Sequence, residues 1–330
     1  MKKIVSLILL SICFIQAEIT AQNSDFNISE FYPIERSHSY VEFEIKYMGY
    51  AKVKGRFTNF KGTFRYDPDN LEKTSVTFSL DVESIDTDLD FRDRDLKSNH
   101  WFDAEAYPKI TFESTNVEEV ASGLEVTGNL TIKDVTKEVT IDMDKGSGIL
   151  KDTRGDSQVI FTGEFDLNRK DYGVEGERWS ALKEGITAVS SEVTIEVSLL
   201  GKKINKSNAQ NFVRNPDSPP GKLYMIANEQ GVDKAIQEFE TMKGSEVARI
   251  NQNTLLAVGY NLLKDGKIDE SIRILEHNTK AFPEVGNTFD SYAEALATKG
   301  NLEEARKNYE LSLMKDPTNL NAKEILRHLK

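Results

Sequence analysis

Residues 40–48 read YVEFEIKYM, and their pattern decides the fold class of the first half of the chain. Apolar residues at odd positions alternate with the charged residues Glu42, Glu44 and Lys46. This period of two is typical of a strand that buries one face and leaves the other in water, as strands of antiparallel sheets do. The apolar positions are Val41, Phe43, Ile45 and Tyr47.

The same alternation recurs along the chain as far as residue 200. It is present in SVTFSLDV (75–82), GLEVTGNLTI (123–132), EVTIDM (138–143), QVIFTGEFDL (158–167) and SEVTIEVSLL (191–200). About eight such strands with no long helical segment among them predict an antiparallel sandwich or a closed barrel. The interior of an eight-stranded barrel either fills with side chains or holds one small ligand.

Several short motifs within residues 31–201 make a specific resemblance. They are His38-Ser39 with Val41-Glu42-Phe43, Ser84–Thr87, Arg92–Ser98, Trp101–Asp103, Tyr107–Thr115, and Asn168-Arg169 with Asp171–Gly173. Each motif alone is weak, but their order and spacing together resemble the YceI family of periplasmic polyisoprenoid- and lipid-binding proteins. The resemblance implies an all-β antiparallel eight-stranded lipocalin-like barrel with a short helix and loop as its lid. It also implies homodimers, which YceI proteins often form.

The resemblance further implies that the barrel holds an isoprenoid-like or acyl chain, including an isoprenoid quinone, and needs no other cofactor. We expect the inward-facing residues to bind this lipid. They are Phe43, Ile45, Tyr47, Phe57, Phe64, Phe78, Leu80, Phe112, Val126, Phe161, Phe165, Val193 and Ile195.

The segment RDRDLKSNHWFDAEAYPKITF (92–112) gathers charged and aromatic residues, so it allows a metal site, an acid/base cluster or a lid. A metal site would need Asp93, Asp95, His100 and Asp103 to converge, and their spacing matches no known ligand pattern. We therefore predict no metal and a lid whose inward side chains are Leu96, Trp101 and Phe102.

The segment also departs from the family, and Arg169 leaves two interpretations open. Asp95 and Tyr47 stand where the family usually has histidines, which puts any head-group contact of those histidines in doubt. We expect Arg169 to pair with Asp166 or Asp171; the alternative is a contact with a ligand head group at the mouth of the barrel.

No residue set for catalysis emerges from the sequence. His38-Ser39 has no GxSxG elbow with it, and the lone cysteine, Cys13, lies in the N-terminal apolar run. Without a nucleophile, a base and an orienting group we predict that the protein is not an enzyme.

The first residues predict export. Lys2 and Lys3, an apolar run at 4–15 and a small-residue cleavage site before Gln22 are typical of a signal peptide over residues 1–21. We expect a periplasmic or secreted protein; Ile12 disfavours a lipid anchor at Cys13, because lipoprotein boxes have a small residue there. A net charge of −12 argues against nucleic acid and anionic membranes as standing partners.

After the barrel domain (22–201) we expect a proline-rich linker (202–221) and helical repeats (222–330). Gly266 and Gly300, and Pro283 and Pro317, are each 34 residues apart, a spacing that resembles the tetratricopeptide repeat. Such repeats could bind a protein or peptide partner or only stabilise the chain. The leading hypothesis is a lipid carrier; the alternative is an interaction protein whose barrel is filled with side chains.

Overall fold

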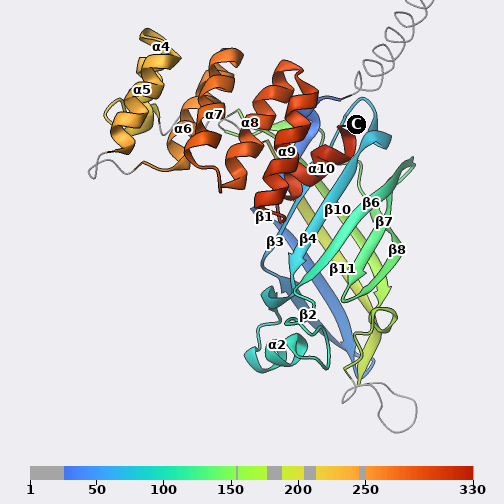
Figure 1. Cartoon of the computed structure of the whole chain (residues 1–330). Coiled ribbons are helices and arrows are strands. Elements are labelled where there is room, and N and C mark those ends of the chain that lie inside the picture. The colour runs from blue at the N-terminus through green and yellow to red at the C-terminus, as the bar shows by residue number, and fades with distance from the viewer. Residues whose placement is uncertain (1–25, 154, 177–187, 204–212, 245–249, 330) are drawn as a thin grey trace, which may run out of the picture. The chain divides into compact units, whose positions relative to one another are not determined.

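The computed structural model describes residues 26–153, 155–176, 188–203, 213–244 and 250–329 (Figure 1). Residues 30–205 form one compact unit of strands, and the chain from 206 onward forms a second compact unit of helices. The predicted signal peptide, residues 1–21, lies outside the described residues. Within the described residues, no helix is both long enough and apolar enough to span a bilayer.

The strands of the first unit close into a ring. They are β1 (Phe31–Tyr47), β2 (Ala51–Phe57), β3 (Phe60–Arg65), β4 (Ser75–Asp81), β5 (Ile85–Asp86), β6 (Lys109–Val120), β7 (Gly123–Ile132), β8 (Val135–Met143), β9 (Leu150–Lys151), β10 (Ser157–Asn168) and β11 (Val189–Lys202). The order β1-β3-β4-β6-β7-β8-β10-β11 returns to β1 through the β11–β1 pairing, and all neighbours are antiparallel. In the described part of the chain this is the eight-stranded closed barrel that the resemblance implied.

The short strands β2 and β5 lengthen this ring at one end. β2 pairs with the second half of β1 and runs on into β3, which pairs with its first half. β5 follows β4 after the 3-10 turn at Val82–Ser84 and pairs with β2. β2 with β3, and β4 with β5, therefore each act as one bent strand of the barrel. The lid helix follows β5 in the chain, so the lid attaches at this lengthened end.

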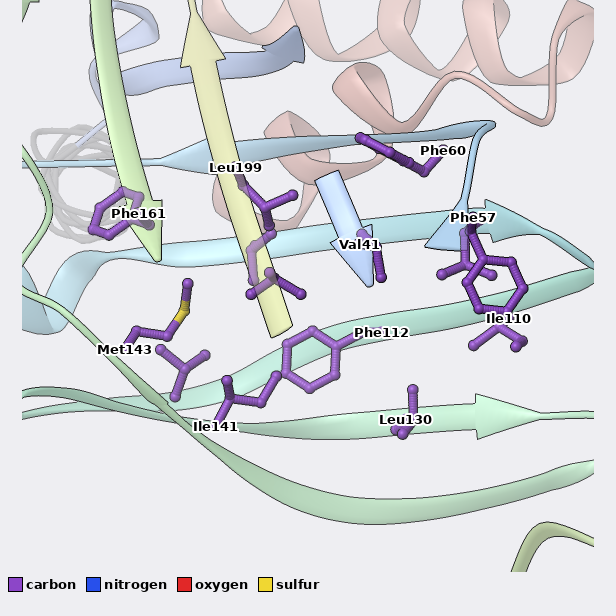
Figure 2. Close-up of a cluster of buried hydrophobic side chains, with 14 of the residues drawn as sticks. Val41, Phe57, Phe60, Ile110, Phe112, Leu130, Ile141, Met143, Phe161 and Leu199 are labelled. Carbon is purple, nitrogen blue, oxygen red and sulfur yellow. The ribbon is translucent and has the colours of Figure 1, made fainter. Parts of the chain in front are cut away.

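The register places one face of every strand inside the barrel. Phe43 lies opposite Ile195, and Ile195 lies opposite Phe165 on the next strand, whereas Glu164 and Glu196 pair on the outer face. Figure 2 shows side chains from the surrounding strands, among them Phe112, Ile141 and Leu199, meeting in this interior. The predicted inward orientation of the first strand is therefore confirmed.

The lid consists of α2 (Asp90–Lys97) and the loop that leads to β6. The helix is only eight residues long, with Asp90 and Asp93 in its first turn and Arg94 and Lys97 in its last. This charge order suits the helix dipole, because acidic groups stabilise the N-terminus and basic groups the C-terminus. The predicted short helix at the end of the barrel is therefore confirmed.

The second unit stacks helices in antiparallel pairs. They are α4 (Pro219–Glu229), α5 (Val232–Lys243), α6 (Gln252–Lys264), α7 (Ile268–Ala281), α8 (Gly286–Lys299), α9 (Leu302–Lys315) and α10 (Leu320–His328). Gly266 and Gly300 both have positive φ, 78° and 89°, at the turn inside each pair. A Cβ at Gly259 would lie 2.6 Å from Leu275, so the repeat needs a small residue there. The 34-residue periodicity is thus that of a tetratricopeptide-like solenoid.

One predicted boundary was wrong. The linker was expected to extend to residue 221, but Pro219 and Pro220 form the first turn of α4, and the Ser218 side chain accepts a hydrogen bond from the Gly221 N–H. Proline suits this position because the first helical N–H groups have no intrahelical partner.

Candidate functional site

The barrel encloses a cavity of about 550 Å³. Its walls are almost entirely aliphatic and aromatic side chains from the strands and from the lid. A volume of this size falls in the range of pockets that hold a small molecule. The interaction-protein alternative required a barrel filled by its own side chains, and this barrel is not filled.

All but two of the residues predicted to bind lipid line this cavity. Those that line it are Phe43, Ile45, Tyr47, Phe57, Phe64, Phe78, Leu80, Phe112, Phe165, Val193 and Ile195. The structure brings together residues that are as far apart in the sequence as Phe43 and Ile195, because β11 closes the ring against β1.

The other two predicted residues, Val126 and Phe161, lie outside the cavity. Phe161 is 1% exposed and packs against Phe64 and Tyr66, with ring centroids 5.2 Å and 5.4 Å apart. These rings fill the barrel at the end away from the lid, where the remaining void is only about 10 Å³. Alternation correctly gave the direction of both side chains, but it carries no information on depth along the barrel axis.

Further wall residues were not named in advance as lipid contacts. They are Val41, Val53, Val76, Phe91, Ile110, Leu130, Ile132, Ile141, Met143, Leu167, Val174, Val189, Val197 and Leu199. Most belong to the same alternating stretches, so the pattern was sufficient to find them. Phe91 and Val174 are exceptions, since they lie outside the strands and no periodicity points to them.

The predicted inward residues of the lid, Leu96, Trp101 and Phe102, all line the cavity. Trp101 is 5% exposed, and the ring of Phe102 lies 6.3 Å from that of Phe57 with an edge-to-face orientation. A Cβ at Gly176 would lie 2.3 Å from the Trp101 ring, so the chain can cover the indole there only with glycine. The lid is thus packed onto the barrel by its aromatic residues.

Polar contacts hold the lid in place. The Trp101 Nε1–H donates to Asp95 Oδ2 at 3.0 Å, and the Thr87 N–H donates to Asp93 Oδ1 at 2.9 Å. Arg92 donates through Nε to Thr87 Oγ1 at 2.8 Å. Asp93 and Asp95 therefore accept hydrogen bonds within the lid. Over the described residues, no three His, Cys, Asp or Glu side chains are grouped so that they could hold a metal ion.

Arg169 does not make the ion pair that we expected. Its guanidinium donates to the carbonyl oxygens of Val174, Glu175, Val189 and Ser190 at 2.5–3.2 Å. The expected partners are engaged elsewhere: Asp171 with Lys137, and Asp166 with Thr194. The reason is burial: Arg169 is only 4% exposed, and its fork of N–H groups finds acceptors in the backbone oxygens around it.

This arginine also contributes to the cavity wall. Its Cζ lies 5.0 Å from the Trp101 ring centroid, and burial lowers the pKa of the guanidinium. An arginine stays charged even so, because its ordinary pKa is far above neutral. The charged and hydroxyl-bearing residues of the cavity wall are Arg169, Thr87, Arg92, Asp95, Thr111 and Tyr47, most of them beside the lid.

Comparisons with known proteins agree with this architecture. Residues 32–200 match the YceI-like domain. A UPF0312 protein of Pseudomonas aeruginosa (strain LESB58) is 35% identical over 164 residues, which cover 50% of this chain and 83% of that protein. Protein YceI of Salmonella arizonae is 33% identical over 158 residues, 48% of this chain and 82% of that protein. The crystal structure of Burkholderia cenocepacia BcnA is 24% identical and covers 51% of this chain and 99% of that one, with a TM-score of 0.45.

Proposed function

The chain belongs to the YceI-like family through residues 32–200, and from that premise we propose that its barrel binds the tail of an isoprenoid-like or acyl lipid without catalysing a reaction. The observation that carries the proposal is the apolar cavity of about 550 Å³ enclosed by the strands of the barrel and the lid. A polar metabolite has too few hydrogen-bonding partners along such walls, whereas a hydrocarbon tail needs none.

The energetics suit reversible binding. A tail that buries about 500 Å² gains on the order of 12 kcal/mol at about 25 cal/mol per Å². Loss of translational freedom and ordering of a flexible chain offset much of this gain. A dissociation constant between roughly micromolar and nanomolar remains, which allows both capture and release of the lipid.

The polar atoms near the lid are the proposed place for the head group. Arg169 and Arg92 carry positive charge there, whereas the Thr87 hydroxyl already donates to Asp93 Oδ1. A quinone, an amide or an acid group would each find a donor among these side chains. The rest of the ligand then extends past Phe43 and Ile195, which are neighbours on the cavity wall, toward the closed end at Phe161.

The wider role is also part of the proposal. We propose export to the periplasm or the medium by the signal peptide at 1–21, and a division into a barrel (22–201), a linker beginning at 202 and repeats continuing to 330. The repeats would contact a protein or peptide partner. Self-association as a homodimer would follow the habit of the family.

Extraction of the purified full chain into organic solvent, followed by mass spectrometry, tests the lipid proposal. We expect an apolar lipid in near-stoichiometric amount. Ile195→Glu should lose it, because an unpaired carboxylate in an apolar cavity is costly; Ile195→Val is the matched control and should retain it. A wild-type extract that contains no lipid, together with failure to take up an added isoprenoid or fatty acid, would contradict the proposal.

A further inference from the structure

Large hydrophobic side chains are exposed around the lid end of the barrel. Tyr50 is 93% exposed, Phe91 is 66% exposed and Tyr47 is 39% exposed, and Met48 and Leu89 beside them are exposed too. Tyr47 and Phe91 also line the cavity, so the cavity opens where these side chains lie. We call these five residues the rim: Tyr47, Met48, Tyr50, Leu89 and Phe91.

The rim is not explained by folding of the barrel. Met48 and Gly49 form the turn between β1 and β2 with positive φ, 53° and 75°. Asparagine and glycine are preferred in such a turn, and a side chain like that of methionine raises its energy. Met48 and Tyr50 do not contribute to the hydrophobic core. The turn therefore presents apolar side chains outward at a cost to stability.

The charges beside the turn select the partner. The uncharged tip, residues 47–51, is flanked by Lys46 and Lys52, which lie directly opposite each other, and Lys54 follows on β2. Glu44 pairs with Lys52 and Lys54, and within the described residues no carboxylate pairs with Lys46. Glu44 thus offsets part of the positive charge of Lys52 and Lys54, and an anionic surface could pair with Lys46.

Aromatic side chains with flanking lysines suit the interface of a bilayer, where the rings enter the head-group layer and the ammonium groups meet lipid phosphates. We propose that the rim and this lysine pair dock the barrel onto an anionic lipid surface, so that the cavity mouth faces the membrane. The net charge of −12 conceals this local basic turn. On the lid side, Asp88 and Asp90 flank Leu89, so the positive charge of the mouth is confined to the turn.

This inference rests on the proposed function in one respect, the passage of a lipid through the mouth. A lipid tail exposes its apolar surface when it crosses water, and a mouth pressed against the bilayer avoids that exposure. Docking itself needs only the rim and the lysines. The two ideas can therefore be tested separately.

The test is sedimentation of the full chain with vesicles of phosphatidylcholine alone or of phosphatidylcholine mixed with phosphatidylglycerol. Met48→Ser/Tyr50→Ser removes apolar surface outside the cavity, and we expect about tenfold weaker partition to the mixed vesicles. Lys46→Gln should weaken partition to the mixed vesicles about fivefold, Lys46→Gln/Lys52→Gln should weaken it further, and both should leave partition to phosphatidylcholine unaffected. Met314→Ser removes an exposed methionine side chain from the helical unit; it is the control and should have no effect.

The lipid content of each variant, measured by extraction, separates the two ideas. Retained lipid with lost sedimentation supports docking, and an empty wild-type barrel that still sediments would overturn the proposed function but leave docking intact. Wild type that stays in the supernatant with both vesicle types overturns docking. So does a Met48→Ser/Tyr50→Ser variant that sediments like wild type, or one whose only defect is the loss of a dimer in gel filtration.

Discussion

The indole N–H of Trp101 donates to the Asp95 carboxylate at 3.0 Å. Asp95, a candidate metal ligand in the sequence, thus accepts a hydrogen bond that stabilises the lid. The same indole ring lies beneath the Arg169 guanidinium at 5.0 Å. Trp101 thus joins the lid helix to the turn after β10. An aromatic ring with one polar edge suits this position, because its apolar faces border the cavity and its N–H finds an acceptor.

Asp95→Ala should destabilise the barrel by about 1–2 kcal/mol, because it leaves the Trp101 N–H buried without a partner. Lipid retention should change little, since the apolar wall remains. His100→Ala, at the exposed position directly before Trp101, is the control and should fall within about 0.5 kcal/mol of wild type. Chemical denaturation and lipid extraction measure the two effects. A loss of retention that depends on added metal would restore the metal hypothesis.

Phe161→Ala should lower the free energy of unfolding of the barrel by about 3–5 kcal/mol, because it opens a cavity in the packed end formed with Phe64 and Tyr66. The identity of the bound lipid should be unchanged. Phe78→Ala is the comparison, since Phe78 lines the cavity itself. Its effect should be larger on lipid retention and smaller on stability, and equal effects of the two variants would show that the cavity and the closed end are not separate.

A chain that ends at Ile204 should fold cooperatively and retain lipid, because the contacts of the chain divide between residues 205 and 206. Thermal unfolding and mass spectrometry of an extract measure this. Insoluble protein, or a barrel that unfolds without cooperativity, would mean that the helices complete the barrel core. This truncation also tests the proposed domain division.

Asp290 in α8 should make the helical unit more stable at acidic pH. Burial raises the pKa of this carboxyl group from its usual 3.8 to about 6, although Asn319 donates a hydrogen bond to its Oδ1. The folded state therefore binds the proton more tightly than the unfolded state. Its contribution, up to about 3 kcal/mol, is fully present below about pH 4 and is lost as the pH rises through 6.

The Asp290→Asn variant tests the sign of this effect. It should stabilise the helical unit at neutral pH and flatten the dependence of its unfolding on pH between about 4 and 6. Asp269→Asn, at an exposed position on α7, is the control and should leave the slope unchanged. Parallel curves for wild type and Asp290→Asn would refute the prediction.

Local pattern was sufficient for much of the fold. Alternation of period two determined which face of each strand is buried, because successive side chains of a strand point to opposite sides. The 34-residue spacing of Gly266 and Gly300 determined the repeat, since each turn between paired helices needs a residue with positive φ. The motifs around Asp95 and Arg169 identified the family and with it the lid.

Tertiary structure alone decided what these side chains do. Phe161 and Phe165 have the same phase in one strand, yet Phe161 fills the closed end and Phe165 faces the cavity, because depth depends on the tilt of β10 in the closed ring. Arg169 bonds to carbonyl groups instead of the neighbouring aspartates because the backbone oxygens of 174–175 and of 189–190 lie within reach of its guanidinium. Tyr47 and Phe91 border the same cavity because the ring brings the end of β1 and the lid to one end of the barrel. The sequence by itself determined the phase of each residue; closure of the barrel determined its neighbours, because only closure sets contacts between segments far apart in the chain.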